Sequence, residues 1–163
     1  MRIPLLLLVV GSVAWAENPA TTAALTLERA GNDAQTKCDV ALMRAKQFEA
    51  VDAKAALQSA REAVEAGSPM RDEFDASFTV AKNPGSDFGT PLIASRLSRL
   101  RGKLFECVRD AELINVRLLK SQASSSPDAR KQAIGAAETF LQRYAADKTA
   151  ADVKKWLAEL KTP

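Results

Sequence analysis

The chain has 163 residues, 47% of them apolar, and a formal net charge of +3, which suits one ordinary domain with an ample core. General nucleic-acid binding needs a concentrated basic surface, so the balanced charge predicts no nucleic-acid partner. The absence of histidine excludes Ser-His and Cys-His catalytic pairs and histidine-ligated metal or haem sites.

The first residues are typical of a short secretory signal peptide. Met1 and Arg2 precede the apolar run from Ile3 to Val10, and Ala14-Trp15-Ala16 is a typical cleavage sequence. We therefore expect a signal peptide over 1–16 and a single helical domain over 17–163. The apolar run is too short to cross a bilayer. These features predict an exported protein without a transmembrane segment, which favours a bacterial periplasm, with secretion as the alternative.

The next residues predict long helices. Asn18-Pro19 is a helix start, and no further proline occurs before Ser68, so we expect one helix over 20–66 that ends at Gly67. Ser68-Pro69 predicts a second, short helix, and 82–90 is a turn-rich excursion. Thr90-Pro91 then begins a long central helix.

Two segments carry matching coiled-coil seams, in which apolar or small residues alternate at spacings of four and three. One seam consists of Ile93, Leu97, Leu100, Leu104, Cys107, Ala111, Ile114 and Leu118, and the other consists of Leu27, Gly31, Ala34, Cys38, Ala41, Ala45, Phe48 and Asp52. An antiparallel arrangement pairs all of them in one register, in which the numbers of facing residues total 145. The sequence therefore predicts an all-α fold, with a long antiparallel hairpin over 19–123 whose second arm is broken.

The only two cysteines, Cys38 and Cys107, face each other in this register. Two cysteines in an exported chain favour a disulfide bond. The alternative is a pair of buried free thiols. We expect the disulfide, because both residues fall on independently identified seams at the same level.

The C-terminal region predicts a helix pair over 127–161 that begins at Ser126-Pro127. Its residues Phe140-Leu141-Gln142-Arg143-Tyr144 and Trp156-Leu157-Ala158-Glu159-Leu160 carry a resemblance. Residues 129–161 resemble one helix pair of the tetratricopeptide-like repeats of bacterial envelope proteins. The resemblance implies a packing module used in protein contacts, and we expect the pair to dock on the hairpin.

Three groups of side chains are candidates for a functional site. Arg96, Arg99 and Lys103 share a helical face and form a candidate interaction patch, although a solvated helix face is the favoured explanation, because such charge runs are common on exposed faces. The second group, Phe74, Phe78 and Phe88, lies beside the interrupted arm and would line an apolar groove if left uncovered. The third, the acidic cluster at 72–75, lacks the ligand pattern of a calcium loop, so we expect no metal site and no cofactor.

These features favour a non-catalytic exported protein that acts through protein contacts, as an envelope adaptor or accessory factor with an unidentified partner. The alternative is a periplasmic chaperone or carrier of an apolar ligand that uses the phenylalanine groove. An enzyme based on carboxylates ranks third, because no catalytic motif is present. The sequence leaves the oligomeric state open.

Overall fold

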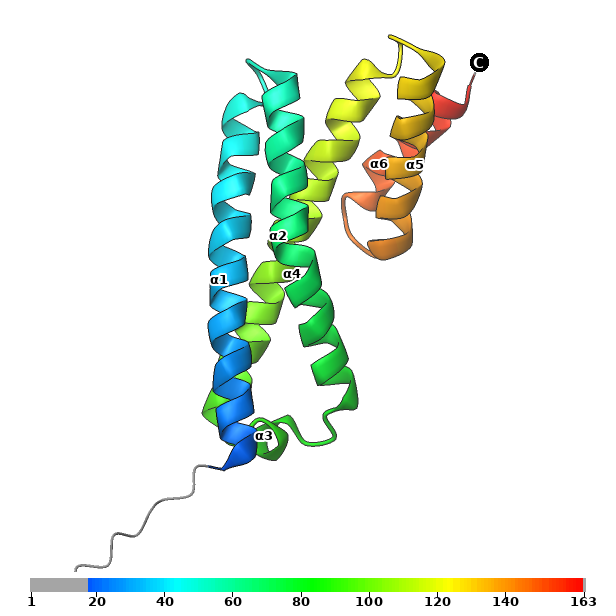
Figure 1. The fold of residues 1–163 in the computed structure, drawn as a ribbon. Coiled ribbons are helices and arrows are strands. Elements are labelled where there is room, and N and C mark those ends of the chain that lie inside the picture. The colour runs from blue at the N-terminus through cyan, green and yellow to red at the C-terminus, as the bar shows by residue number, and fades with distance from the viewer. Residues whose placement is uncertain (1–17, 163) are drawn as a thin grey trace, which may run out of the picture.

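The computed structural model describes residues 18–162, and the expected signal peptide lies outside them. Six helices make up this part of the chain. They are α1 (Pro19–Phe48), α2 (Ala53–Val80), α3 (Pro84–Asp87), α4 (Pro91–Gln122), α5 (Pro127–Arg143) and α6 (Ala150–Lys161). The all-α prediction is confirmed. The long helices α1, α2 and α4 form an elongated bundle, α3 lies at one end of it, and α5 and α6 lie alongside the other half (Figure 1).

Local capping explains several helix starts. The side chains of Asn18, Thr90 and Ser126 each accept a hydrogen bond from a backbone N–H in the first turn of α1, α4 and α5. Each is followed by proline, whose missing N–H is harmless at the first helical position. The predicted starts of these three helices are therefore confirmed.

The first helix is shorter than predicted, because the chain turns at residues 49–52. Phe48 ends α1, and the backbone N–H groups of Val51 and Asp52 both donate to its carbonyl. The Asp52 side chain then caps α2 by accepting from the Ala55 N–H at 2.9 Å. This turn contains neither glycine nor proline, so the sequence carries only the weak signal of one aspartate cap.

The predicted break at Gly67 and Pro69 is also wrong, since α2 continues through both. Gly67 is buried where α2 packs closely against α1 and α4. An added Cβ there would lie 2.6 Å from Val108 Cγ2 and 3.0 Å from Cys38 Sγ, so only glycine fits without a shift of these neighbours. Pro69 is exposed, so the backbone carbonyl that loses its partner there can bond water. Figure 1 shows α2 changing direction about halfway along, as an internal proline causes.

The long antiparallel hairpin is formed by α1 and α2, and α4 runs parallel to α1 (Figure 1). The register totalling 145 is therefore a wrong prediction. Glu28 pairs with Arg96 at 3.2 Å, Gly31 packs against Leu100, and Glu49 pairs with Arg117. All of these pairs have nearly the same sequence separation, which is 69 residues at the disulfide. The alternation of four and three reads the same in both directions, so it identifies the packed faces but not their relative direction.

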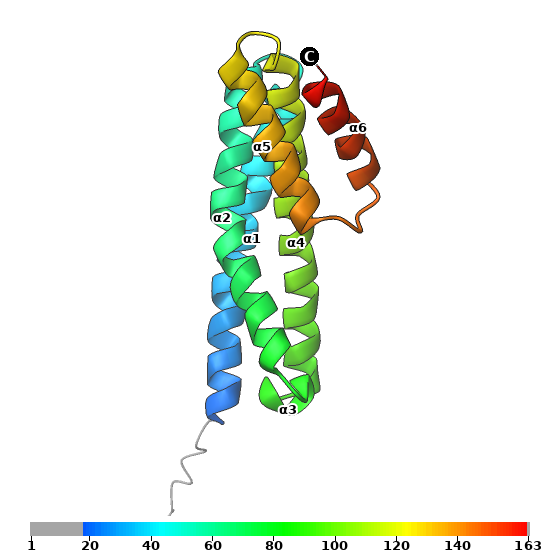
Figure 2. The same ribbon diagram turned by 90° about the vertical axis from the view of Figure 1, so that its right-hand side faces the viewer.

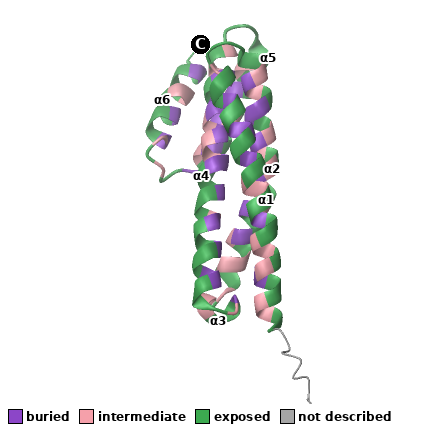
Figure 3. Ribbon diagram, turned by 90° about the vertical axis from the view of Figure 1, so that its left-hand side faces the viewer, coloured by how far each residue is buried: buried purple, intermediate pink, exposed green. Residues whose placement is uncertain are grey.

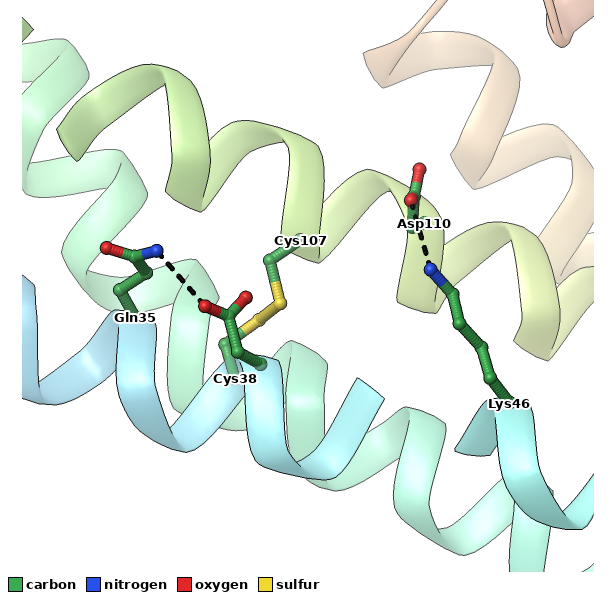
Figure 4. The surroundings of a disulfide bond; sticks show 6 residues. Gln35, Cys38, Lys46, Cys107 and Asp110 are labelled. Carbon is green, nitrogen blue, oxygen red and sulfur yellow. Dashed lines mark hydrogen bonds and ion pairs between the residues drawn. A yellow bond between two sulfur atoms is a disulfide. The ribbon is translucent and has the colours of Figure 1, made fainter. Parts of the chain in front are cut away.

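Cys38 and Cys107 form the predicted disulfide, with their Cα atoms 6.3 Å apart. Both the antiparallel and the parallel registers place these two residues face to face. Figure 4 shows the bond between α1 and α4, with Lys46 and Asp110 paired nearby at 3.6 Å. The bond clamps the first helix of the bundle to the third.

The C-terminal pair packs on the bundle as expected. Helix α5 lies against α4, and α6 packs on α5 and contacts α4 (Figure 2). Val116 of α4, Phe140 and Tyr144 at the end of α5, and Val153 of α6 join in one buried cluster. Figure 3 shows buried positions on the facing sides of the helices and exposed positions on their outer sides. Helix α4 is therefore the central element, packed on one side by α1 and α2 and on another by α5.

Candidate functional site

The predicted phenylalanine groove is filled. Phe74 and Phe88 are buried and Phe78 is partly buried, so the three belong to the core. The rings of Phe78 and Phe88 lie 4.9 Å apart, and the Arg101 guanidinium sits 5.3 Å from the centre of the Phe78 ring. The excursion over 82–90, which includes α3, folds over this end of the bundle. The phenylalanines therefore anchor the excursion and line no open groove.

The predicted basic patch is an exposed face of α4. Arg96, Arg99 and Lys103 are all exposed and border a shallow hollow of about 150 Å³ between α1 and α4. Arg96 pairs with Glu28 of α1 at 3.2 Å. One of the three cations is thus already paired with an acidic residue of the same chain.

A buried polar cluster between α2, α4 and α5 was not foreseen from the sequence. Arg71 of α2 is only 7% exposed, and its Nη1 donates to the Tyr144 hydroxyl at 2.9 Å. Its Nε and Nη2 donate to Asp72 Oδ1 at 3.0 and 2.7 Å. A buried guanidinium is tolerated only with such partners. Arg71 therefore ties α2 to the end of α5.

Tyr144 has an altered acidity at this junction. Burial raises its pKa to about 12, and the negative charge of Glu112 acts in the same direction. The positive charges of Arg71 and Arg143 oppose the shift. The phenol therefore stays protonated at neutral pH, and its hydroxyl accepts the Arg71 hydrogen bond.

Glu112 of α4 is the most unusual acidic residue of the cluster, because it is only 8% exposed. Its Oε1 accepts a hydrogen bond from Arg143 Nη1. Its Oε2 is buried and accepts none from another residue, and the same holds for Asn115 Oδ1 one turn further along α4. Native proteins leave few buried polar atoms unpaired, so each exception needs an explanation.

Both of these residues line a cleft of about 320 Å³ between α2, α4 and α5. Arg61 and Glu65 of α2, together with Gly135 and Thr139 of α5, form much of the remaining wall. Val64, Val116 and Ala136 add apolar surface. The cleft falls within the size range of small-molecule sites. It is the candidate functional site of the molecule.

A sequence signal for this site exists in α4. Beside the seam toward α1, the helix carries a second stripe at Val108, Glu112, Val116 and Leu119, all of which are buried. The stripe repeats every three or four residues, so it predicts a second packed face. A glutamate inside an otherwise apolar stripe marks the position where a charge is buried.

Comparisons with known proteins leave the function open. No protein-family model, no curated protein and no solved structure matches the chain. Within residues 18–162, no three His, Cys, Asp or Glu side chains are grouped so that they could hold a metal ion. None of the helices in that range has both the length and the apolar content that crossing a membrane requires. The surface and the cleft are therefore the features that bear on function.

Proposed function

We propose that this chain is a non-catalytic exported protein that acts through protein contacts, as an adaptor or accessory factor of the bacterial cell envelope. The observation that carries the proposal is a row of exposed apolar side chains at the end of α1 and in the turn that follows it. Val40, Met43 and Val51 are 44%, 59% and 79% exposed. Val40 and Met43 lie about one turn apart on α1, Phe48 is the last residue of that helix, and Val51 lies in the turn that follows. We call these four residues the α1 row.

The α1 row differs from scattered surface hydrophobics in two respects. Its members are close together in the chain, at the end of α1 and in the turn that follows it, and Met43 lines an open hollow that also includes Lys46 and Gln47. Methionine adapts to irregular partner surfaces because its side chain is unbranched and polarisable. Contiguous apolar surface on a small protein commonly marks an interaction site. The partner that fits the row is a protein with its own apolar ridge, such as an amphipathic helix.

The position of the row leaves it accessible. Helix α1 lies on the side of the bundle away from α5 and α6 (Figure 1), and all four residues of the row are exposed. The C-terminal pair, which resembles a tetratricopeptide-like unit, would then serve as a packing module on the bundle. Because an oxidising compartment is needed to form and keep a structural disulfide, the Cys38–Cys107 bond supports export.

Site-specific photocrosslinking in cells tests the proposal. A photoreactive side chain at Met43 should give discrete protein adducts, which the substitution Val40→Glu or Val51→Glu should abolish. A label at Gln132 on the exposed surface of α5 is the control, and a label at Arg99 tests the basic patch. Absence of adducts at Met43, or identical adducts at Met43 and Gln132, would overturn the proposal. The alternative, a carrier of an apolar ligand, depended on an open groove at Phe74, Phe78 and Phe88. Because these side chains are packed in the core, we propose protein contacts alone.

A further inference from the structure

The end of the bundle that carries α3 exposes two large apolar side chains. Val80, the last residue of α2, is 77% exposed, and Leu92, in the first turn of α4, is 68% exposed. Together with Val51 they are the most exposed large apolar residues over 18–162. Figures 1 and 2 show the end of α2, α3 and the start of α4 at the same end of the bundle. We call Val80 and Leu92 the apolar tip.

The neighbours of both residues hold the apolar tip outward. Ile93, which follows Leu92, is buried in the phenylalanine cluster, and Ala81, which follows Val80, packs against the same cluster. The backbone at both positions is therefore fixed by the core, with the tip side chains on the outer surface. Because removing apolar surface from water is favourable, this end of the bundle gains stability in contact with an apolar phase.

A basic surface begins beside the apolar tip. Residues 88–105 are the longest stretch of the chain without an acidic residue, and four of them are basic. Arg96, Arg99 and Lys103 are exposed and follow Leu92 along α4 at spacings of four, three and four residues. This spacing places all of them on one face of the helix. We call the three basic residues the α4 strip.

Much of the positive charge of the α4 strip is unmatched within the protein. Arg96 pairs with Glu28 of α1 at 3.2 Å. Arg99 and Lys103 have no carboxylate within ion-pair distance anywhere in the described part of the chain. The strip therefore presents two unpaired cations and a third whose charge is shared.

The α4 strip differs from an ordinary solvated helix face. On the exposed side of α1, charges of both signs alternate, and Lys37 pairs with Asp33 one turn away at 2.6 Å. The connector over 81–90 next to the strip contributes no net charge, because Lys82 and Asp87 are its only charged residues. The excess positive charge at this end of the molecule therefore comes from the strip.

The combination of tip and strip selects the class of partner. Apolar side chains enter the interface of a bilayer, and basic side chains beside them are attracted to anionic headgroups. Arg96 and Arg99 lie four and seven residues beyond Leu92, which is about 6 and 10 Å along the helix. Their long side chains reach the headgroup layer when the tip touches the bilayer. A soluble polyanion would use the strip alone, and an apolar protein surface would use the tip alone.

We propose that the α3 end of the bundle docks on anionic phospholipid bilayers, with Val80 and Leu92 in the interface and Arg96 and Arg99 against the phosphate groups. Helix α1 starts at this end (Figure 1), and the α1 row begins about 30 Å further along it. The row therefore stays clear of the bilayer. Lipid docking does not depend on the protein contacts proposed for the row, so either proposal can fail without the other.

Flotation with lipid vesicles tests the proposal. The protein is the expected mature chain, residues 17–163, because the apolar run over 3–10 would bind lipid by itself. The vesicles contain phosphatidylcholine alone, or phosphatidylcholine and phosphatidylglycerol in equal parts. We expect about tenfold stronger binding to the mixed vesicles, as one or two basic side chains at an anionic surface provide. Most of this preference should disappear at about 0.5 M salt, because salt screens the exposed charges.

Matched variants locate the docking surface. Leu92→Glu and Arg99→Glu should each lower binding to the mixed vesicles about tenfold. Both residues are exposed, and an acidic residue in the first turn of α4 suits the helix dipole, so both variants should fold. Val51→Glu and Arg44→Glu introduce the same changes at exposed positions toward the other end of the bundle. These two control variants should bind like the natural chain.

A fluorescent variant tests contact of the apolar tip with lipid. The emission of Leu92→Trp should move to shorter wavelength on mixed vesicles and stay unchanged with phosphatidylcholine alone. Trp156 on α6 contributes the background, which the natural chain measures. Soluble polyphosphate should leave the emission of Leu92→Trp unchanged, because it offers no apolar phase.

Three results would overturn the proposal. The first is equal binding to both kinds of vesicle. The second is an equal loss of binding in Arg99→Glu and Arg44→Glu, or in Leu92→Glu and Val51→Glu, which would show an effect of net charge or surface polarity alone. The third is binding to polyphosphate without binding to mixed vesicles, which would make the α4 strip a phosphate site with no role at a membrane.

Discussion

The two ends of the three-helix bundle are packed with side chains of different size, small ones at the disulfide end and large ones at the phenylalanine end. At the disulfide end, Ala41, Ala45, Ala56, Ala60 and Ala63 line the contact between α1 and α2. At the phenylalanine end, Phe74 and Phe88 join the leucines at 97, 100 and 104. Small side chains let helix axes approach closely, and large ones fill the space where axes diverge.

The bend of α2 at Pro69 connects these two solutions. Before it, α2 runs close to α1, and beyond it the lower half moves away (Figure 1). Phe74 occupies the space that opens, with its ring against Gly31 of α1. The proline and the phenylalanine thus form one structural unit. The difference between the ends teaches that a helix bend is tolerated where a large side chain fills the gap beside it.

Among the substitutions considered, the largest loss of stability is expected at the phenylalanine end. Phe74 has no exposed surface, so Phe74→Ala should lower the free energy of unfolding by about 4 kcal/mol through lost burial and a new cavity. Urea unfolding followed by circular dichroism measures this loss. Leu92→Ala is the control, because Leu92 is 68% exposed and its substitution should change stability by less than about 0.5 kcal/mol. A loss below about 1 kcal/mol for Phe74→Ala would show that this end is not packed as described.

Removing the disulfide tests the other end. The combined substitutions Cys38→Ala and Cys107→Ala should lower the free energy of unfolding by about 3 kcal/mol, because the bond restricts a long loop of the unfolded chain. Reduction of the natural chain should give a similar loss. Two reactive thiols in the unfolded, unreduced protein would contradict the assignment of the bond.

The two buried helical glycines sharpen the comparison. Gly31→Ala would place a Cβ 2.7 Å from Phe74 Cε2, and Gly67→Ala would place one 3.0 Å from Cys38 Sγ. Each should destabilise by about 2 kcal/mol through overpacking. The loss for Gly67→Ala should shrink in a chain lacking the disulfide, whereas the loss for Gly31→Ala should stay constant within about 0.5 kcal/mol. Equal coupling of both glycines to the disulfide, measured in a double-mutant cycle, would erase the distinction between the ends.

The smallest effect at neutral pH concerns Tyr144, the only tyrosine of the chain. Burial raises its pKa to about 12, above the value of about 10 for an unfolded tyrosine. The folded state therefore holds a proton that the unfolded state releases between these values. The Tyr144 hydroxyl therefore leaves the free energy of unfolding independent of pH below about pH 10. As the pH rises from about 10 toward 12, its titration lowers the free energy of unfolding.

Ultraviolet absorbance of the phenolate follows this titration directly. The midpoint should lie near 12 in the folded chain and near 10 in denaturant. A midpoint near 10 in the folded chain would contradict the burial of the hydroxyl. Tyr144→Phe is the matched control, because it keeps the ring and removes the absorbance change.

Local signals made much of the fold predictable. Asn18, Thr90 and Ser126 each combine a capping side chain with a following proline, and both features act on a single turn. The disulfide was predictable because its two cysteines lie on equivalent positions of two seams. These inferences need no knowledge of how the helices are arranged.

The register and the candidate site depend on longer-range packing. The seam pattern is symmetric under reversal, so the direction of α4 follows from the turn at 49–52, where only Asp52 gives a signal. Glu112 resembles an ordinary surface glutamate until α5 covers the second face of α4. The phenylalanines were identified correctly as a group, but their exposure depends on where the excursion folds.

The parallel direction of α1 and α4 is the central claim, because the cleft and the accessibility of the α1 row both depend on it. Spin labels at Gln47 of α1 and at Arg99 or Ser121 of α4, all exposed, test it by pulsed dipolar spectroscopy. A rise of about 1.5 Å per residue places Gln47 about 8 Å along the axis from Ser121 and about 26 Å from Arg99. The account predicts that the pair of Gln47 and Ser121 gives the shorter distance. A shorter distance between Gln47 and Arg99 would establish the antiparallel register instead and contradict the account.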